Sequence, residues 1–256
     1  MRFGVILIAL AIVATLFIVA PLVSLVMQVP WSNLPASLEN LEPFKLSIWT
    51  STLATLFALM LGVPLAWILD KSNGRIAGTL RPLILSPIVL PPTVAGLALL
   101  SLWGRNGDLG HVVYETSGWS VPFTSTAVVI AGVFVSTPFV VLICESNFRQ
   151  LPREIEDAAI IDRATNKQIF EKIALPQSRN SIFTAGLLAW ARAIGEFGAT
   201  LMFAGSFPGT TQTWPMFIYQ QLDVEIETAY TNAVLMLVLA IFVVYLLRNQ
   251  LRETFR

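Results

Sequence analysis

Charged residues are scarce in this chain of 256 residues. Asp, Glu, Lys and Arg make up 12% of it, against about 25% in a typical soluble domain, while 55% of the residues are hydrophobic and the mean hydropathy is +0.71. So few charges cannot cover an ordinary water-facing surface, which excludes a soluble globular protein. The formal net charge is zero, so the overall basic surface typical of a nucleic-acid-binding protein is missing as well.

Cysteine and histidine occur once each, as Cys144 and His111. A single cysteine cannot form an internal disulfide, and Cys144 stands in an apolar run where a small buried side chain is expected. His111 has no His-Glu-x-x-His pattern around it, and no serine elbow stands at an apolar run. We therefore predict no intramembrane enzyme: the chain has no catalytic residue, binds no metal and holds no cofactor of its own.

A phosphate-binding loop is also missing. No Gly-x-x-x-x-Gly-Lys-Ser/Thr run occurs, and the glycine-rich stretch Gly104–Gly107 lacks the lysine, so we interpret it as a turn. No polar segment is long enough for a soluble ATPase domain. Any ATP hydrolysis that serves this protein is therefore expected on a separate subunit.

Long apolar runs are what the chain has instead. Six of them are long enough to cross a bilayer as helices, which need about 20 apolar residues and satisfy their own backbone hydrogen bonds in lipid. They cover Phe3–Val26, Leu46–Leu69, Pro82–Trp103, Ser125–Cys144, Ser181–Ala204 and Ala229–Leu247. The first is longer than the apolar core of a signal peptide. The prediction is an all-α, polytopic membrane protein with six transmembrane helices.

The basic residues predict an orientation. Of the 16 lysines and arginines, Lys45 and Arg105 would lie outside and Arg192 lies within a span, which leaves 13 inside if the N-terminus is cytoplasmic. The inner ones are Arg2, Lys71, Arg75, Arg81, Arg149, Arg153, Arg163, Lys167, Lys172, Arg179, Arg248, Arg252 and Arg256. Because basic residues concentrate in cytoplasmic segments, we expect both termini in the cytoplasm and a multi-pass protein of the cytoplasmic (inner) cell membrane.

This topology divides the chain into three parts. Residues 1–45 hold the first transmembrane helix and an outer loop, residues 46–247 form a core of five transmembrane helices, and residues 248–256 are a short cytoplasmic tail. The longest inner segment, residues 146–180, belongs to the core. It contains the run DAAIIDRATNKQIFEKIALP.

That run predicts short amphipathic helices on the inner side. Its apolar residues alternate with charges, as in a helix that lies against something outside the membrane; they are Ala158, Ile161, Ala164 and Ile169. Asp157 would complement the helix dipole near the start, and Leu175–Pro176 would end the second helical stretch. The small side chains at Ala158 and Ala159 would allow a partner to approach closely. An ordinary solvated loop is the alternative.

The same run resembles the EAA loop of the permeases of ATP-binding-cassette (ABC) importers. The residues that match in register are Asp157, Ala158, Ala159, Ala164, Phe170, Ile173, Leu175 and Pro176. The resemblance implies the type I importer permease fold, in which this loop is a coupling helix that docks on the ATPase subunit. Asp157 replaces the usual glutamate, and Arg163 replaces a glycine that allows a sharp bend. Arg163 would either straighten that bend or pair with an acidic group on the ATPase.

The fifth run carries two charges inside the membrane. Arg192 and Glu196 are four residues apart and so share one helical face. A charge at the centre of a lone span costs about 2.5–3.5 kcal/mol on insertion scales, so the two must be paired or wet. They either line the translocation path or form an ion pair that fixes helix packing. Gly195 and Gly198 would permit close helix contact.

Three passages resemble the molybdate/tungstate permeases, with sulfate permeases as close relatives. They are Leu90–Gly96, Gly104–Gly110, and Arg192–Gly205 with Pro208–Gly209, Thr213, Pro215 and Ile218–Tyr219 behind it. Molybdate or tungstate is the expected cargo, and sulfate or thiosulfate is the alternative. The candidate residues for the translocation path are Pro91, Pro92, Thr93, Arg192, Glu196 and Thr200.

The resemblance also implies partners. Two copies of the chain would form one pathway as a homodimer, a periplasmic or lipid-anchored oxyanion-binding protein would deliver the anion, and ATP would be used by the ATPase subunit. An ion-coupled secondary transporter is a further alternative. It would usually show internal repeats and broken helices, and it would leave the run from Asp157 to Pro176 unexplained.

Overall fold

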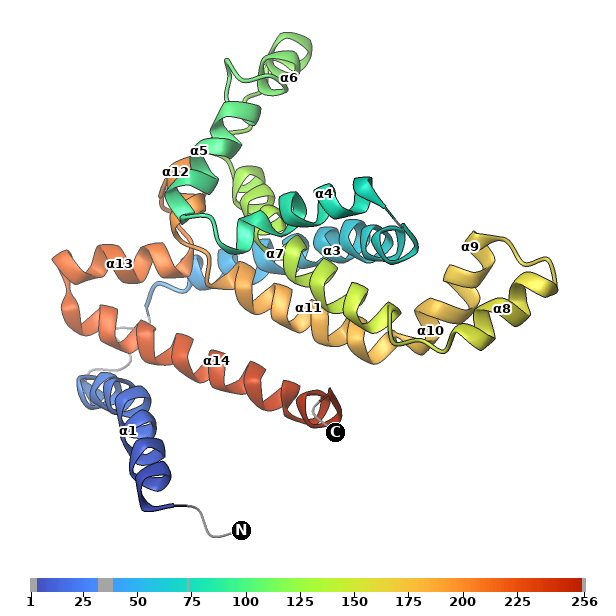
Figure 1. Ribbon diagram of the computed structural model, residues 1–256. Helices are drawn as coiled ribbons and strands as arrows, with labels where there is room; N and C mark the ends of the chain where they lie inside the picture. Colours follow the sequence, from blue (N-terminus) through green and yellow to red (C-terminus); the bar gives the residue numbers. More distant parts are fainter. Residues whose placement is uncertain (1–3, 32–38, 73, 255–256) are drawn as a thin grey trace. The chain divides into compact units, whose positions relative to one another are not determined.

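The computed structural model describes residues 4–31, 39–72 and 74–254. Within these residues every regular element is a helix (Figure 1), as the apolar runs predict. Phe3, the expected start of the first span, and Arg2 and Arg256, two of the inner basic residues, lie outside them. The chain forms two compact units: residues 1–41 with 217–242, and residues 42–216 with 243–256.

The first unit is built from α1 (Val5–Met27), most of α13 (Trp214–Val224) and the first part of α14 (Ile226–Thr254). α1 carries no acidic or basic side chain, and Thr15 donates its hydroxyl hydrogen to the Ala11 carbonyl at 2.8 Å. Between α13 and α14, Glu225 accepts a hydrogen bond from the Thr228 hydroxyl at 2.8 Å. That contact starts α14 with a carboxylate near its positive dipole end.

The second unit has a core of three long helices: α3 (Glu42–Lys71), α7 (Ser125–Phe148) and α11 (Arg179–Ile194). The contact surfaces are rich in alanine, which lets helix backbones approach closely. Ala58, Ala66, Ala185 and Ala189 are all fully buried there. Cys144 belongs to the same cluster and is buried as a small apolar residue, as expected.

Serine and threonine side chains inside these helices bond back to their own backbone. Ser51 donates to the Ser47 carbonyl at 2.6 Å and Thr55 to the Ser51 carbonyl at 2.7 Å in α3; Ser136 donates to the Gly132 carbonyl at 2.5 Å in α7. Such bonds satisfy polar groups where lipid offers no partner. They explain how α3 remains a membrane helix despite its many hydroxyls.

Four of the six predicted spans are continuous helices, and the other two are broken. α1, α3, α7 and the Ile226–Arg248 part of α14 are long and apolar enough to cross a membrane. The third predicted span instead consists of Ala77–Ile88 and Pro92–Trp103, which meet at 114°, and the fifth of Arg179–Ile194 and Gly198–Ala204, which meet at 60°. The six predicted spans are reached when each bent pair counts as one span, and the apolar runs did not reveal the two breaks.

The breaks have local causes. The first half of the third span is α4 (Arg75–Leu85) with the 3-10 turn η2 (Ser86–Ile88), and its second half is α5 (Pro92–Trp103). Pro91 and Pro92 have no N–H to continue a helix, but a proline fits at the first position of a new one. In the fifth span α11 ends at Ile194, residues 195–197 are not helical, and α12 (Gly198–Ala204) begins after them.

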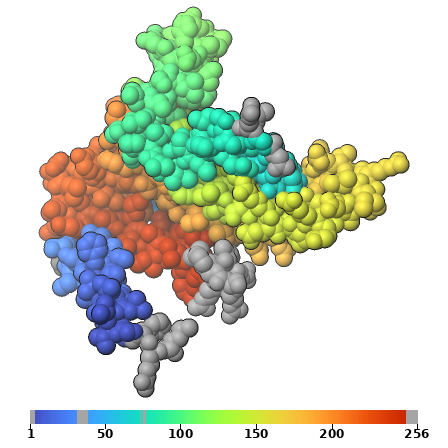
Figure 2. Space-filling view, viewed as in Figure 1, coloured from blue at the N-terminus to red at the C-terminus, as the bar shows by residue number. Residues whose placement is uncertain are grey.

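The shorter helices α6 and α8–α10 belong to the segments that connect the longer helices. α6 (Gly110–Ser117) follows α5 and ends at Gly118, which has a positive φ of 69°. α8 (Arg153–Ile161), α9 (Asn166–Ile169), the π-helical turn η3 (Phe170–Ala174) and α10 (Leu175–Gln177) connect α7 to α11. We call residues 153–177 the α8–α10 segment. Within the second unit it protrudes beyond the first turn of α4, as the yellow region of Figure 2 shows.

Candidate functional site

The α8–α10 segment contains two helical stretches joined by a tight turn. The matched residues of the EAA-like pattern divide into two groups. Ala159, Ala164, Phe170, Ile173 and Leu175 pack against the core of the second unit. Asp157, Ala158 and Pro176 are exposed, and so is Arg163, which departs from the pattern. The pattern therefore combines residues that anchor the segment with residues that face outward.

Phe170 is the main anchor. Its ring lies 5.6 Å from that of Trp67 in α3 and 6.4 Å from that of Phe148 in α7, and the Trp67 and Phe148 rings meet edge to face at 5.3 Å. Aromatic pairs in this distance range contribute beyond the area they bury. The spaced phenylalanine thus fixes the second helical stretch to two core helices.

The turn between the stretches keeps its bend with Arg163 in it. Arg163 has φ 61°, the left-handed region that glycine tolerates best. Its N–H donates to the Ile160 carbonyl and the N–H of Ala164 donates to the Ala159 carbonyl, both at 2.9 Å. These two bonds define a Schellman C-cap. Arg163 therefore does not straighten the bend, and that one of the two expectations was wrong.

The helix ends differ from the predicted ones. α8 begins at Arg153, and its first-turn acids are Glu154 and Glu156 rather than Asp157. The second stretch begins with a capping box, in which Thr165 and Gln168 bond to each other's backbone N–H. Pro176 does not end it, because η3 leads directly into α10, which accommodates the proline in its first turn. The helical path is interrupted at Ser178.

The outward face of the segment is apolar in α8. Ile160 is 57% exposed and Ile161 81% exposed, and Ala158 is exposed beside them. Of the four residues expected on one apolar face, Ala164 and Ile169 point to the core while Ala158 and Ile161 point away from it. Ala159 also packs inward, so only Ala158 of the two small residues is open to a partner.

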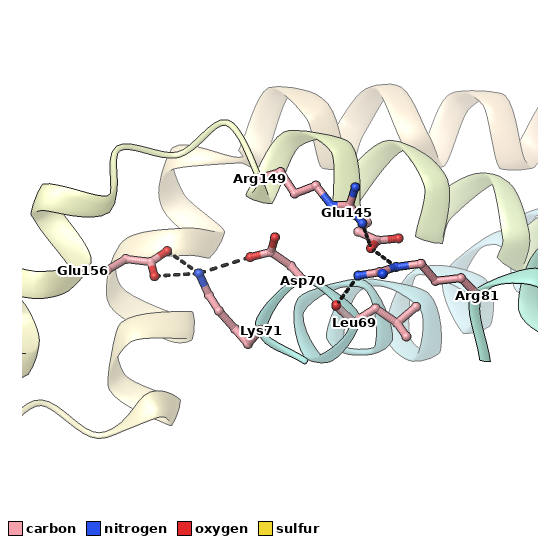
Figure 3. Close-up of polar contacts among 7 residues, drawn as sticks. All are labelled: Leu69, Asp70, Lys71, Arg81, Glu145, Arg149 and Glu156. Carbon is pink, nitrogen blue, oxygen red and sulfur yellow. Dashed lines mark hydrogen bonds and ion pairs between the residues drawn. The ribbon is translucent and has the colours of Figure 1, made fainter. Parts of the chain in front are cut away.

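A network of ion pairs lies where the segment meets the core (Figure 3). Glu156 in α8 accepts two hydrogen bonds from Lys71, the last residue of α3, at 2.6 and 2.7 Å. Glu145 in α7 is 5% exposed and pairs with Arg81 of α4 at 2.6 Å and with Arg149 at 2.5 Å. A buried carboxylate needs such partners to remain charged.

The break in the fifth span is held by the two charges predicted there. Arg192 in the last turn of α11 pairs with Glu196 at 2.5 Å, and Glu196 is 3% exposed. The other oxygen of Glu196 accepts a hydrogen bond from the N–H of Ala199 at 2.8 Å. The carboxylate thus neutralises the start of α12 and the arginine the end of α11, each at the dipole end that favours it.

Glu196 also borders a small polar cavity of about 10 Å³, which is room for about one water. Its polar lining residues are Ser47, Thr50, Ser51, Glu196, Thr200 and Thr213. The Thr213 hydroxyl oxygen is buried and has no hydrogen-bond partner among the described residues. Thr200, a predicted path residue, is therefore brought next to Glu196.

Pro91, Pro92 and Thr93 stand apart from that cavity. All three are exposed at the start of α5. They are linked to the fifth span by packing of α5 on α12: a Cβ on Gly198 would lie 2.5 Å from the Cβ of Pro92, and one on Gly96 2.5 Å from the Cβ of Met202. The two broken spans therefore meet through glycines, as expected for Gly198. Gly195 is exposed instead.

Sequence reasoning missed several residues of this site. Lys71, Arg81, Glu145 and Glu156 find partners 64 to 85 residues away in the chain, which no local pattern reveals. The one available signal was Glu145 itself, an acidic residue at the end of an apolar run. Ser47 was also missed, because hydroxyls in a membrane helix are usually bonded to their own backbone. Thr213 was part of the family resemblance and was not predicted as a path residue.

Comparison with known proteins places these features in a family. The whole chain, residues 1–256, matches the family described as "Binding-protein-dependent transport system inner membrane component". It is 38% identical over 237 residues to the molybdenum transport system permease protein ModB of Mycobacterium bovis, which covers 91% of this chain and 89% of that protein. It is 34% identical over 197 residues to a probable sulfate transport system permease protein of Chlorokybus atmophyticus, covering 75% and 68%.

A solved structure has the same fold. A chain of a bacterial alginate ABC transporter, crystallised with an alginate pentasaccharide-bound periplasmic protein, superposes with a TM-score of 0.72 at 13% identity. The match covers 95% of this chain and 93% of the other. At so low an identity the likeness concerns the fold, including the predicted importer permease architecture.

Proposed function

This chain belongs to the binding-protein-dependent transport system inner membrane components, and from that premise we propose that it carries molybdate across the cytoplasmic membrane. It is the multi-pass permease subunit of an ABC importer rather than an enzyme. Tungstate, an oxyanion of the same shape and charge, is the second expected cargo. The single observation that carries the choice of cargo is the 38% identity to a molybdenum permease over 91% of the chain.

Two alternatives rank lower. The sulfate permease relative is aligned over less of both chains, so sulfate remains the second candidate for the cargo. Two broken spans would also suit an ion-coupled secondary transporter. The family match over the whole chain and the EAA-like pattern favour an ATP-driven importer over that mechanism.

The partners follow from the importer assignment. An ATPase subunit and a binding protein complete the machine, and ATP is bound by the ATPase. The α8–α10 segment is the coupling loop, and the exposed face of α8 with Ala158, Ile160 and Ile161 docks in a groove of the ATPase. Support comes from the division of the segment, since large exposed apolar side chains beside a rigid anchor are typical of a docking surface.

Arg163 adds a charge to that docking face. Its side chain is exposed at the tip of the turn. We expect it to meet an acidic group on the ATPase, because an exposed guanidinium on a docking face makes its strongest hydrogen bonds to a carboxylate.

Transport requires the polar cavity beside Glu196 to open. At about 10 Å³ it is too small for a tetrahedral oxyanion. Because Arg192 neutralises Glu196, the lining of the cavity carries no net negative charge that would repel a dianion. Hydroxyl groups such as those of Thr200 and Thr213 would then face the passing anion. Two copies of the chain, each with such a region, form the pathway as a homodimer. ATP binding and hydrolysis by the partner then switch the pathway between outward and inward access.

The test of cargo uses the reconstituted importer. The permease, ATPase and binding protein encoded together are purified, placed in vesicles and supplied with molybdate, tungstate or sulfate. We expect ATP-dependent molybdate uptake, weaker competition by sulfate than by tungstate, and tight molybdate binding by the binding protein in calorimetry. Uptake of sulfate alone would instead identify a sulfate permease. A solubilised chain that never retains an ATPase would refute the importer assignment itself.

A further inference from the structure

The contact between Lys71 and Glu156 joins two elements that have different roles. Glu156 stands in the first turn of α8, the helix with the exposed apolar face. Lys71 is the last residue of α3, and its Nζ lies 2.6 Å and 2.7 Å from the two carboxylate oxygens of Glu156. Asp70 approaches the same Nζ at 3.1 Å, and the Trp67 ring lies 4.3 Å from it.

The end of α3 is itself held in place from two other helices (Figure 3). Arg81 of α4 donates to the Leu69 carbonyl at 2.7 Å and to Glu145 of α7 at 2.6 Å. That carboxylate is also bound by Arg149 at the end of α7. Lys71 therefore connects α8 to a helix end that is linked to α4 and α7, so these helix ends would move together.

The opposite half of α3 reaches the polar cavity. Ser47, Thr50 and Ser51 line it together with Glu196, and the Ser47 hydroxyl accepts a hydrogen bond from the N–H of Trp214 at 2.7 Å. α3 is one continuous helix of 30 residues, which at 1.5 Å per residue is about 45 Å long. A displacement of its Lys71 end is thus carried to the cavity by a single helix.

From this arrangement we infer that the Lys71–Glu156 ion pair transmits movement of α8 through α3 to the polar cavity. The inference rests on the proposed role of α8 in docking the ATPase. Lys71 and Glu156 act as positioning residues in this transmission of movement, since neither touches the cargo. α8 also reaches the core through the Ala159 side chain, through the turn at Arg163 and through residues 149–152. The Lys71–Glu156 contact is the ion pair that joins it to α3.

The exposure of the pair separates this role from a merely stabilising one. The Lys71 side chain is 39% exposed and that of Glu156 15% exposed. Partly exposed ion pairs add little to stability, because water screens them and ordering two long side chains opposes them. Breaking this pair should therefore leave folding and ATPase binding intact and reduce the uptake obtained from each ATP.

The test is a charge-reversal cycle in the complete importer. The variants are Lys71→Glu, Glu156→Lys and the double exchange, with Glu156→Gln as a milder single change. For each, we would measure retention of the ATPase on purification, the ATP hydrolysis rate and molybdate uptake per ATP. Each single reversal should lower uptake per ATP about fivefold or more, the range of a typical coupling free energy. The double exchange should restore most of it.

A matched control lies in the same segment. Lys167 and Glu171 form a second lysine–glutamate pair at 3.8 Å, with side chains 79% and 51% exposed, but both residues belong to the second helical stretch. Reversing that pair, singly or doubly, changes the same charges without touching α3. Uptake per ATP should stay close to that of the parent protein.

The outcomes distinguish this inference from the proposed function. If the parent protein retains no ATPase, the importer assignment fails and takes the inference with it. If the ATPase is retained but Lys71→Glu and Glu156→Lys transport normally, only the inference is overturned. It is also overturned if the single variants lose the ATPase, because the pair would then shape the docking surface, or if the double exchange restores nothing.

Discussion

Two buried glutamates, Glu145 and Glu196, hold the second unit together in different ways. Glu145 is shared by arginines of two helices, α4 and α7, and so joins elements that lie far apart in the sequence. Glu196 pairs with Arg192 one turn earlier and caps α12 just behind it. Both are charged residues in an apolar chain. Glu145 with Arg81 and Arg149 forms a tertiary contact, which we call the clamp. Glu196 instead stabilises the local break within one span.

The largest expected effect is at the clamp. Glu145→Ala would remove two hydrogen bonds between charged groups, each worth about 1.5–3 kcal/mol, from a carboxylate that is 5% exposed. We expect a large drop in thermal stability of the purified complex, measured by loss of monodisperse protein on heating. Glu145→Gln keeps the shape and should lose less. A Glu145→Ala protein as stable as the parent would contradict the clamp.

Glu196→Ala should cost somewhat less, about 2–3 kcal/mol, because the remaining Arg192 still lies at a helix end that favours a cation. Glu196→Gln retains an acceptor for the Ala199 N–H, so its loss of thermal stability should be smaller. Uptake distinguishes the two roles of this pair. If Glu196→Gln is as stable as the parent but transports poorly, the carboxylate serves the pathway as well as the break.

The packing of the two broken spans is tested at Gly198. An alanine Cβ there would lie 2.5 Å from the Cβ of Pro92, and overpacking of this kind costs about 1–3 kcal/mol. We expect a lower melting temperature for Gly198→Ala. Gly195→Ala is the control, because Gly195 is exposed and has a negative φ of −87°. Equal effects of the two substitutions would argue against close contact between α5 and α12.

The smallest expected effect is a gain. Arg163→Gly would relieve a left-handed residue that costs about 1–2 kcal/mol, offset by about 0.4–1 kcal/mol of added freedom in the unfolded chain. The net stabilisation should be about 0.5–1 kcal/mol in a thermal unfolding assay, while Arg163→Ala should bring no such gain. If Arg163→Gly also weakens retention of the ATPase, the arginine serves docking at the expense of stability.

The same contrast shows what the sequence could predict. Hydropathy located all six apolar runs, because length and composition decide whether a helix can cross lipid. It could not locate the breaks, since a window average does not change when Pro91 or Phe197 redirects the backbone. Arg192 and Glu196 were found as a pair because they are one turn apart.

The clamp was not found, because its partners are joined only by the fold. Likewise the spacing of Ala159, Ala164 and Phe170 predicted a family resemblance that the ModB relative and the family match confirm. It did not predict which of these side chains face inward. That depends on the Schellman turn at Arg163, and the turn required a backbone conformation that arginine seldom adopts.

The π-helical turn η3 has a consequence for insertions and deletions. Its five residues, Phe170–Ala174, follow a wider spiral than an α-helix, so the chain accommodates one additional residue in that turn. Removing one residue there would allow regular α-helical bonding to form. Because the wider turn takes up that residue, the shortened stretch would turn the chain about as far as η3 does, and the isoleucines of α8 would keep the side they face now. A one-residue deletion in η3 should therefore be tolerated better than one inside α11, where each residue removed changes the direction of the chain before it by about 100°.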